Sequence, residues 1–169
     1  MNRRFFSYGL QISGRIVYTI WYDNDYSGFQ LTQSGLILAF GNLLDINKYA
    51  AEVNIELVEM DECITHDFDV IDEWLKAPKG KTVKCSEFLN LYNLAGDFRN
   101  SLAERNLDIE DKSYPDLLEK LFWGCNNQAV TPAGKKFTPI WTKAEVRALR
   151  RVMRESLLVF NKNLDFTHD

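Results

Sequence analysis

The sequence has few of the residues that build disulfide frameworks, metal centres and sharp turns. Its 169 residues include three cysteines, two histidines and four prolines. No apolar run approaches the roughly 20 residues that a membrane-spanning helix needs. The odd, widely spaced cysteines, Cys63, Cys85 and Cys125, indicate reduced thiols. Arg3 and Arg4 near the N-terminus have no apolar run behind them, so we expect no secretory signal and a cytoplasmic address.

The sequence also lacks the motifs of the common enzyme chemistries, since G-x-S-x-G, H-E-x-x-H and G-x-G-x-x-G do not occur. Residues 23–28 match the first half of a calcium loop, but Ser34 stands where a bidentate glutamate is required. Residues 80–82 lack the preceding glycine of a phosphate-binding loop. Cys63 and His66 have no second ligand pair to complete a zinc site. We therefore predict no metal, no cofactor and no catalytic residue.

Patterning of the N-terminal third predicts strands followed by a helix. Residues 15–22 are rich in β-branched and aromatic side chains, and residues 5–10 can pair with them through a turn at residues 13–14. Between Thr32 and Leu44, apolar residues recur at helical spacing. Residues 53–58 alternate between apolar and polar side chains, which favours a half-exposed strand.

The rest of the chain predicts helices with recognisable ends. A short helix is expected over residues 67–76, before Pro78, and Ser86 can cap a long helix after it. The next helix is expected to have Ser113 as its cap, Pro115 in its first turn and its end at Gly124. Thr142 and Glu145 form a capping box at the start of the last helix. The expected core face of the last helix is Leu149, Val152, Met153, Leu157 and Phe160. The sequence thus predicts an α+β, predominantly helical single domain over residues 1–169, with a small β-hairpin or sheet near the N-terminus.

Charge is strongly segregated along the chain. The net charge is -4, yet nine acids and no Lys or Arg lie between Tyr49 and Leu75, so the remainder carries +5. Blocks of like charge repel one another and can steer a partner of opposite sign, although a solvated acidic face is an equally good interpretation. The candidate partner-binding residues in this block are Glu59, Asp61, Glu62, Asp67, Asp69, Asp72 and Glu73.

Three other features leave alternative functions open. Arg147, Arg150, Arg151 and Arg154 form one stripe on the last predicted helix, which would suit a nucleic-acid-binding regulator, although the acidic chain as a whole argues against direct nucleic-acid binding. His66 lies among acids, which would favour its protonated form, and a small hydrolase-like enzyme would use it with scattered carboxylates. A polar stripe on the long helix, for which solvent exposure is the default expectation, comprises Asn90, Asn93, Asp97, Asn100 and Glu104.

Residues 91–98 (LYNLAGDF) and 139–145 (PIWTKAE), within a region of about residues 83–160, resemble bacterial immunity proteins of contact-dependent growth inhibition. The resemblance implies a small cytosolic protein that binds a cognate toxin domain and blocks it. Many such toxins are nucleases with basic substrate clefts, which an acidic inhibitor surface would suit. The arginine stripe departs from this pattern, because such a mechanism does not need it. We therefore expect a non-enzymatic immunity protein whose partner is a basic nuclease domain, with no role at a membrane.

Overall fold

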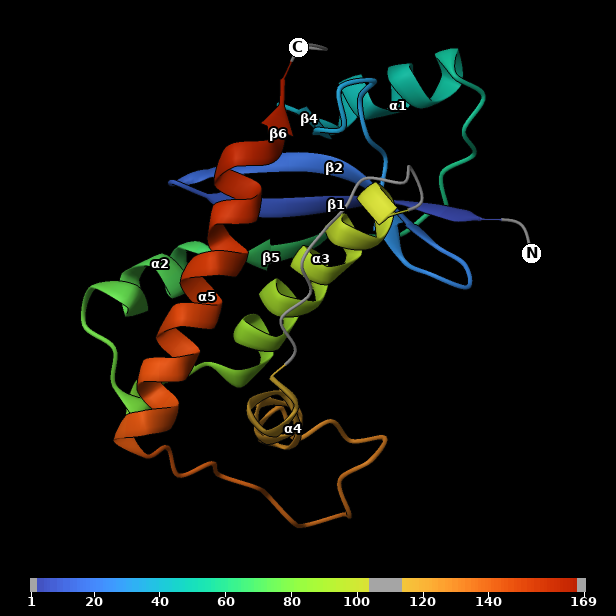
Figure 1. Ribbon diagram of the computed structural model, residues 1–169. Coiled ribbons are helices and arrows are strands. Elements are labelled where there is room, and N and C mark those ends of the chain that lie inside the picture. Colours follow the sequence, from blue (N-terminus) through green and yellow to red (C-terminus); the bar gives the residue numbers. More distant parts are fainter. Residues whose placement is uncertain (1–2, 104–113, 167–169) are drawn as a thin grey trace.

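A long antiparallel hairpin forms the centre of the fold (Figure 1). The computed structural model of the chain describes residues 3–103 and 114–166. Strands β1 (Arg4–Ile12) and β2 (Arg15–Asp23) pair along their whole length, with Arg4 opposite Asp23 and Ile12 opposite Arg15. The two residues between them, Ser13 and Gly14, have positive φ angles of 54° and 76°. Positive φ at both positions is typical of the tight turn that matches the twist of a hairpin.

Strands from distant parts of the sequence extend this hairpin into a six-stranded mixed sheet in the described residues. Strand β5 (Ile64–Asp67) runs parallel to β1 at one edge. On the other side, β3 (Gly28–Phe29) and β4 (Ile37–Phe40) pair antiparallel with β2, and β6 (Leu164–Asp165) runs parallel to β4. The β-structure therefore unites both ends of the chain.

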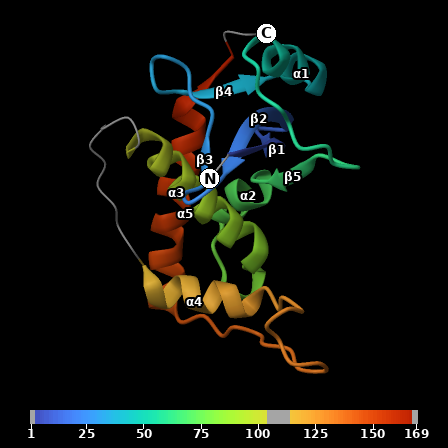
Figure 2. The same cartoon turned by 90° about the vertical axis from the view of Figure 1, so that its right-hand side faces the viewer.

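Helices cover the two faces of the sheet unequally (Figures 1 and 2). One face carries α2, α3 and α5, while α1 lies over the opposite face. The helices are α1 (Leu43–Glu52), α2 (Asp69–Lys76), α3 (Cys85–Ala103), α4 (Pro115–Gly124) and α5 (Lys143–Asn163), with a 3-10 turn at Gly80–Thr82. Among the described residues, none of these helices is long and apolar enough to cross a membrane.

Side-chain alternation along the central hairpin divides the apolar residues between two cores. Leu10 and Ile12 point toward the larger core, where they join Phe68, Phe88 and Phe160. The smaller core, on the α1 face, consists of Ile20, Leu38, Phe40 and Ile46. Successive strand residues point to opposite faces, so β1, β2 and β4 each contribute to both cores.

Several predicted features are confirmed. The α+β class and the N-terminal hairpin are present. Pro115 opens α4, which ends at Gly124. Helix α5 starts after Thr142, whose hydroxyl accepts from the Glu145 N–H while the Glu145 carboxylate accepts from the Thr142 N–H. All five predicted core residues of α5 are buried.

Other predictions are wrong. The helix expected from Thr32 begins only at Leu43, and the apolar residues before it form β4, because that strand is buried on both faces and shows no alternation. The strand expected at 53–58 is reduced to one bridge between Leu57 and Phe5. Ser86 lies inside the first turn of α3 and does not cap it. The predicted cap Ser113 lies outside the described residues. The small hairpin or sheet predicted near the N-terminus is part of a six-stranded sheet in the described residues, which also includes β5 and β6 from later in the chain.

The short strand β3 is held against α3 by a buried hydroxyl. The Ser101 hydroxyl accepts from the Phe29 N–H at 2.7 Å and donates to the Asp97 carbonyl at 2.9 Å. A Cβ atom at Gly28 would lie 2.5 Å from the same hydroxyl, so the two backbones approach closely. Ser101 therefore fixes this loop on the helix together with Asn100, whose side-chain amide donates to the Ser27 carbonyl at 3.3 Å.

We expect Ser101→Ala to lower the free energy of unfolding by about 1–3 kcal/mol, because it leaves the buried Phe29 N–H without an acceptor. Urea unfolding at an unchanged m-value measures the loss. Ser86→Ala, at an exposed serine on the same helix, is the matched control and should change stability by less than about 0.5 kcal/mol. Equal effects of the two substitutions would contradict this role of Ser101.

Candidate functional site

The acidic block that the sequence identified is divided by the fold, and two of its members serve the structure. Asp67 accepts hydrogen bonds from the backbone N–H groups of Asp69 and Val70, and so caps the start of α2. The Asp69 carboxylate accepts from the Gly14 N–H at 2.9 Å and from the Gln11 side chain at 3.3 Å, which fixes the hairpin turn against α2. Neither residue is fully exposed. Their carboxylates are therefore committed to bonds within the protein.

Two further members of the block lie on the exposed surface of α2 and have a cationic neighbour. Lys76 Nζ lies 2.8 Å from a Glu73 oxygen and 3.8 Å from an Asp72 oxygen. These acids raise the pKa of Lys76, the hydrogen bond to Glu73 being the largest cause. Their negative charge is therefore partly balanced locally.

The remaining acids of the block follow α1 and are exposed without ion pairs in the part of the chain that the structure describes. Glu56, Glu59, Asp61 and Glu62 belong to this group, and Glu52, the last residue of α1, directly precedes them. Their segment leaves α1, passes the start of β1 and leads into β5 at the edge of the sheet (Figures 1 and 2). This is the only stretch of the block in which uncompensated charge is concentrated among the described residues.

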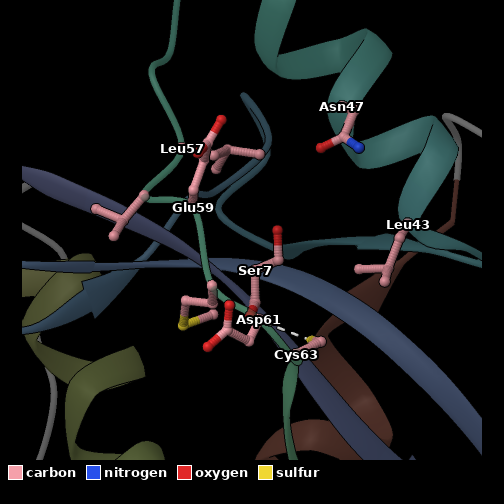
Figure 3. A pocket seen from close by; sticks show the side chains of 9 residues that line it. Ser7, Leu43, Asn47, Leu57, Glu59, Asp61 and Cys63 are labelled. Atoms are coloured by element: carbon pink, nitrogen blue, oxygen red, sulfur yellow. Dashed lines mark hydrogen bonds between the residues drawn. The ribbon is translucent and has the colours of Figure 1, made fainter.

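A groove of about 700 Å³ lies between this segment, β1 and α1, and we call it the acidic groove. Leu43 and Asn47 of α1 stand on one side, and Leu57, Glu59 and Asp61 stand on the other (Figure 3). The complete lining is Ser7, Leu43, Asn47, Leu57, Val58, Glu59, Met60, Asp61 and Cys63. The groove thus combines two carboxylates with apolar side chains.

Backbone and thiol contacts hold the floor of the acidic groove in place. The Val58 N–H donates to the Phe5 carbonyl at 2.8 Å, and the Cys63 thiol donates to the Ser7 carbonyl at 3.3 Å (Figure 3). Partial burial raises the pKa of the Cys63 thiol, so this sulfur remains a neutral donor at neutral pH. The segment that carries Glu59 and Asp61 is consequently tied to β1 at both ends.

A second concavity, of about 450 Å³, lies on the other face of the sheet, and we call it the amide pocket. The sheet supplies Tyr8, Trp21 and His66, and Ser27 lies beside them. Helix α3 supplies Asn90, Tyr92, Asn93, Leu94, Gly96, Asp97 and Asn100. The polar stripe of α3 therefore lines a pocket, which the default expectation of solvent exposure missed. Glu104 lies outside the described residues.

His66 in this pocket differs from the charged residue that the sequence suggested. Its ring stacks on Tyr8 and Phe68, with centroids 5.4 and 6.3 Å apart, and burial lowers its pKa. Asp97 accepts from the Trp21 indole N–H at 2.8 Å, and burial is the main cause that raises the pKa of its carboxyl. No hydrogen bond joins His66 to an acid within the described ranges. The pocket therefore brings a neutral imidazole and a carboxyl group together without the orienting contact of a catalytic pair.

The arginine stripe lies on the exposed side of α5. Arg147, Arg150, Arg151 and Arg154 are all exposed, opposite the buried face of the helix. The Arg151 guanidinium lies 5.4 Å from the centre of the Tyr114 ring. None of the four forms an ion pair with an acid among residues 3–103 and 114–166, so the stripe does not neutralise the described part of the acidic block.

Comparison with known proteins shows similarity of fold only. No protein-family model matches the chain, and neither does any curated protein. The SatS C-terminal domain, solved as a crystal structure in complex with bromine, aligns with a TM-score of 0.50 and 15% identity. The alignment covers 96% of this chain and 93% of that chain. The likeness extends over nearly the whole chain, and at this identity it concerns the arrangement of the backbone.

The lowered pKa of His66 predicts a specific loss of stability in acid. The folded protein favours the neutral imidazole. The contribution of His66 to the free energy of unfolding is therefore fully present above the ordinary pKa of 6.5, and it is lost as the pH falls through the lower pKa of the folded protein. His66→Gln, which stays neutral, should lose less stability than the natural protein below about pH 6.5. Thermal unfolding from pH 7.5 to 4.5 measures this difference, and an imidazole NMR titration gives the pKa directly. A midpoint above 6.5 would contradict the assignment.

Proposed function

We propose that the chain is a non-enzymatic immunity protein that binds a basic toxin domain, such as a nuclease, through the acidic groove. The observation that carries this proposal is that Glu59 and Asp61 are exposed, form no ion pair with any residue that the structure describes, and line a groove together with apolar side chains. The proposed contact set is smaller than the seven acids that the sequence suggested. Asp67 and Asp69 are used in internal hydrogen bonds, while Asp72 and Glu73 pair with Lys76.

The composition of the groove supports a protein partner in particular. Carboxylates at the rim attract a basic surface over several ångströms and accelerate association. The apolar side chains that line the groove, here Leu57, Met60 and Leu43, supply the desolvated contacts from which most binding energy comes. A basic catalytic cleft covered by this surface would lose access to its substrate. In this mechanism the immunity protein acts by occlusion and performs no chemistry.

A second candidate function is a small enzyme that acts at the amide pocket. The observation that favours it is the presence of His66, Asp97 and Tyr8 in one concavity. Rescue of cells from the toxin would then depend on His66 and Asp97, and a His66→Gln/Asp97→Asn variant tests this dependence. Occlusion at the acidic groove predicts that this variant protects as well as the natural protein does.

We expect Glu59→Lys/Asp61→Lys to weaken binding to the proposed partner, a toxin domain to be sought in the neighbouring reading frame, by about tenfold or more, equivalent to about 1.4 kcal/mol. Because charge pairs across the interface are lost, the dependence of affinity on salt should also become shallower. Calorimetry or biosensor measurements at two salt concentrations give both quantities. Growth rescue by co-expression gives the corresponding result in cells.

The matched control is Asp72→Lys/Glu73→Lys, which changes the net charge equally on α2, away from the acidic groove. Both variants alter long-range attraction to a similar extent, so a difference between them reports local contact. The control should retain affinity within about threefold, since exposed pairs such as those with Lys76 contribute little. An unchanged affinity and salt dependence of the Glu59/Asp61 variant would refute the proposal.

A further inference from the structure

A second groove, lined by residues of the opposite charge, involves the loop after α2 and the start of α5. These two segments lie at the opposite end of the molecule from α1 (Figures 1 and 2). The groove has a volume of about 620 Å³. We call it the basic groove. Its lining includes two kinds of side chain that matter for binding. Four are cationic, Lys79, Lys81, Lys143 and Arg147, and two are apolar, Trp141 and Val146.

The walls of the basic groove are held together by specific contacts. The Trp74 indole N–H donates to the Lys79 carbonyl at 3.0 Å, which anchors the loop to α2. A Cβ atom at Gly80 would lie 2.8 Å from the Trp141 Cβ, so the loop packs closely on this tryptophan. Lys120 Nζ lies 5.1 Å from the centre of the Trp141 ring and 2.7 Å from a Glu145 oxygen. The groove is therefore formed by packed elements and does not depend on a single exposed side chain.

The positive charge of the groove is uncompensated. Lys79, Lys81, Lys143 and Arg147 are exposed, form no ion pair within the described ranges, and have no carboxylate beside them in the lining. The N-terminus of α5 does not supply the attraction, because the capping box of Thr142 and Glu145 occupies it. The four side chains thus share the lining of the groove with the apolar side chains of Trp141 and Val146.

We propose that the basic groove binds an acidic peptide segment of a partner protein, with one apolar side chain seated against Trp141. Charge complementarity identifies the acidic character of the occupant, since a lining that includes four cations and no acid favours several carboxylates. The apolar wall between the cations requires a side chain to cover it. The inference is independent of the acidic groove, which lies at the other end of the molecule.

An acidic peptide fits these observations better than a nucleic acid does. The chain carries a net charge of -4, and its acidic segment repels a long polyanion. The groove holds one tryptophan, whereas binding of single strands relies on successive aromatic platforms along a basic track. A short segment with its charges close together meets all four cations without extending toward the acids.

The test uses fluorescence anisotropy with the full chain and a fluorescein-labelled peptide of about ten residues that alternates Glu with Leu. The natural protein should bind this peptide at low salt and release it as salt rises. Lys143→Glu/Arg147→Glu should weaken binding by about tenfold or more. Arg150→Glu/Arg154→Glu, with the same charge change on the same helix, should weaken it by less than about threefold.

Two further probes separate the components of the proposal. A peptide that alternates Glu with Ser should bind more weakly than the Glu-Leu peptide, because it leaves Trp141 and Val146 uncovered. Single-stranded DNA of about ten nucleotides should bind more weakly than the acidic peptide. The proposal is overturned if the natural protein does not bind the Glu-Leu peptide at low salt, or if the two double variants lose equal affinity. Equal affinity for the two peptides, or tighter binding of the DNA, would also overturn it. Since every substituted residue is exposed, circular dichroism should show an unchanged fold.

Discussion

The register of β1 against β2 is the constraint on which the rest of the structure depends. Nine consecutive residue pairs, from Arg4–Asp23 to Ile12–Arg15, determine which side chains face each side of the sheet. Ser7 therefore lines the acidic groove on one face, while its neighbour Tyr8 lines the amide pocket on the other. A slip of one residue would exchange the two faces and destroy both cores. The tight turn at Ser13 and Gly14, which bonds to Asp69, maintains this register.

The fold turns the segregation of charge along the sequence into segregation in space. Acids that form no ion pair within the described ranges lie along the segment after α1, whereas the cations of the basic groove lie in the loop after α2 and at the start of α5, at the other end of the molecule. Apolar side chains accompany the charges in both places. Separation of opposite charges keeps both grooves open to partners, since close approach within the molecule would let them neutralise one another. The arrangement suits a protein with two distinct binding surfaces.

Local signals in the sequence were sufficient for the hairpin and for α5, because turn chemistry, a capping box and a regular apolar stripe act over short distances. They failed at β4, where a strand buried on both faces has no alternation, and at 53–58, where only Leu57 finds a partner. The candidate site was predictable as a charged region but not as a set of contacts. The sequence pattern could not predict the hydrogen bond between Asp69 and Gly14 or the one between Asp97 and Trp21. Such long-range pairs arise from tertiary packing. Opposite faces of the sheet likewise separate the α2 acids from those of the acidic groove.

The most direct test of the central claim is a hydrogen–deuterium exchange footprint of the chain in complex with the proposed toxin partner. Binding at the acidic groove predicts slower exchange of backbone amides in α1 and in the segment from Val53 to Cys63, since these form the groove. Exchange around His66 and the polar stripe of α3 should stay unchanged. Protection confined to α3 and the amide pocket, with none between Leu43 and Cys63, would contradict the account.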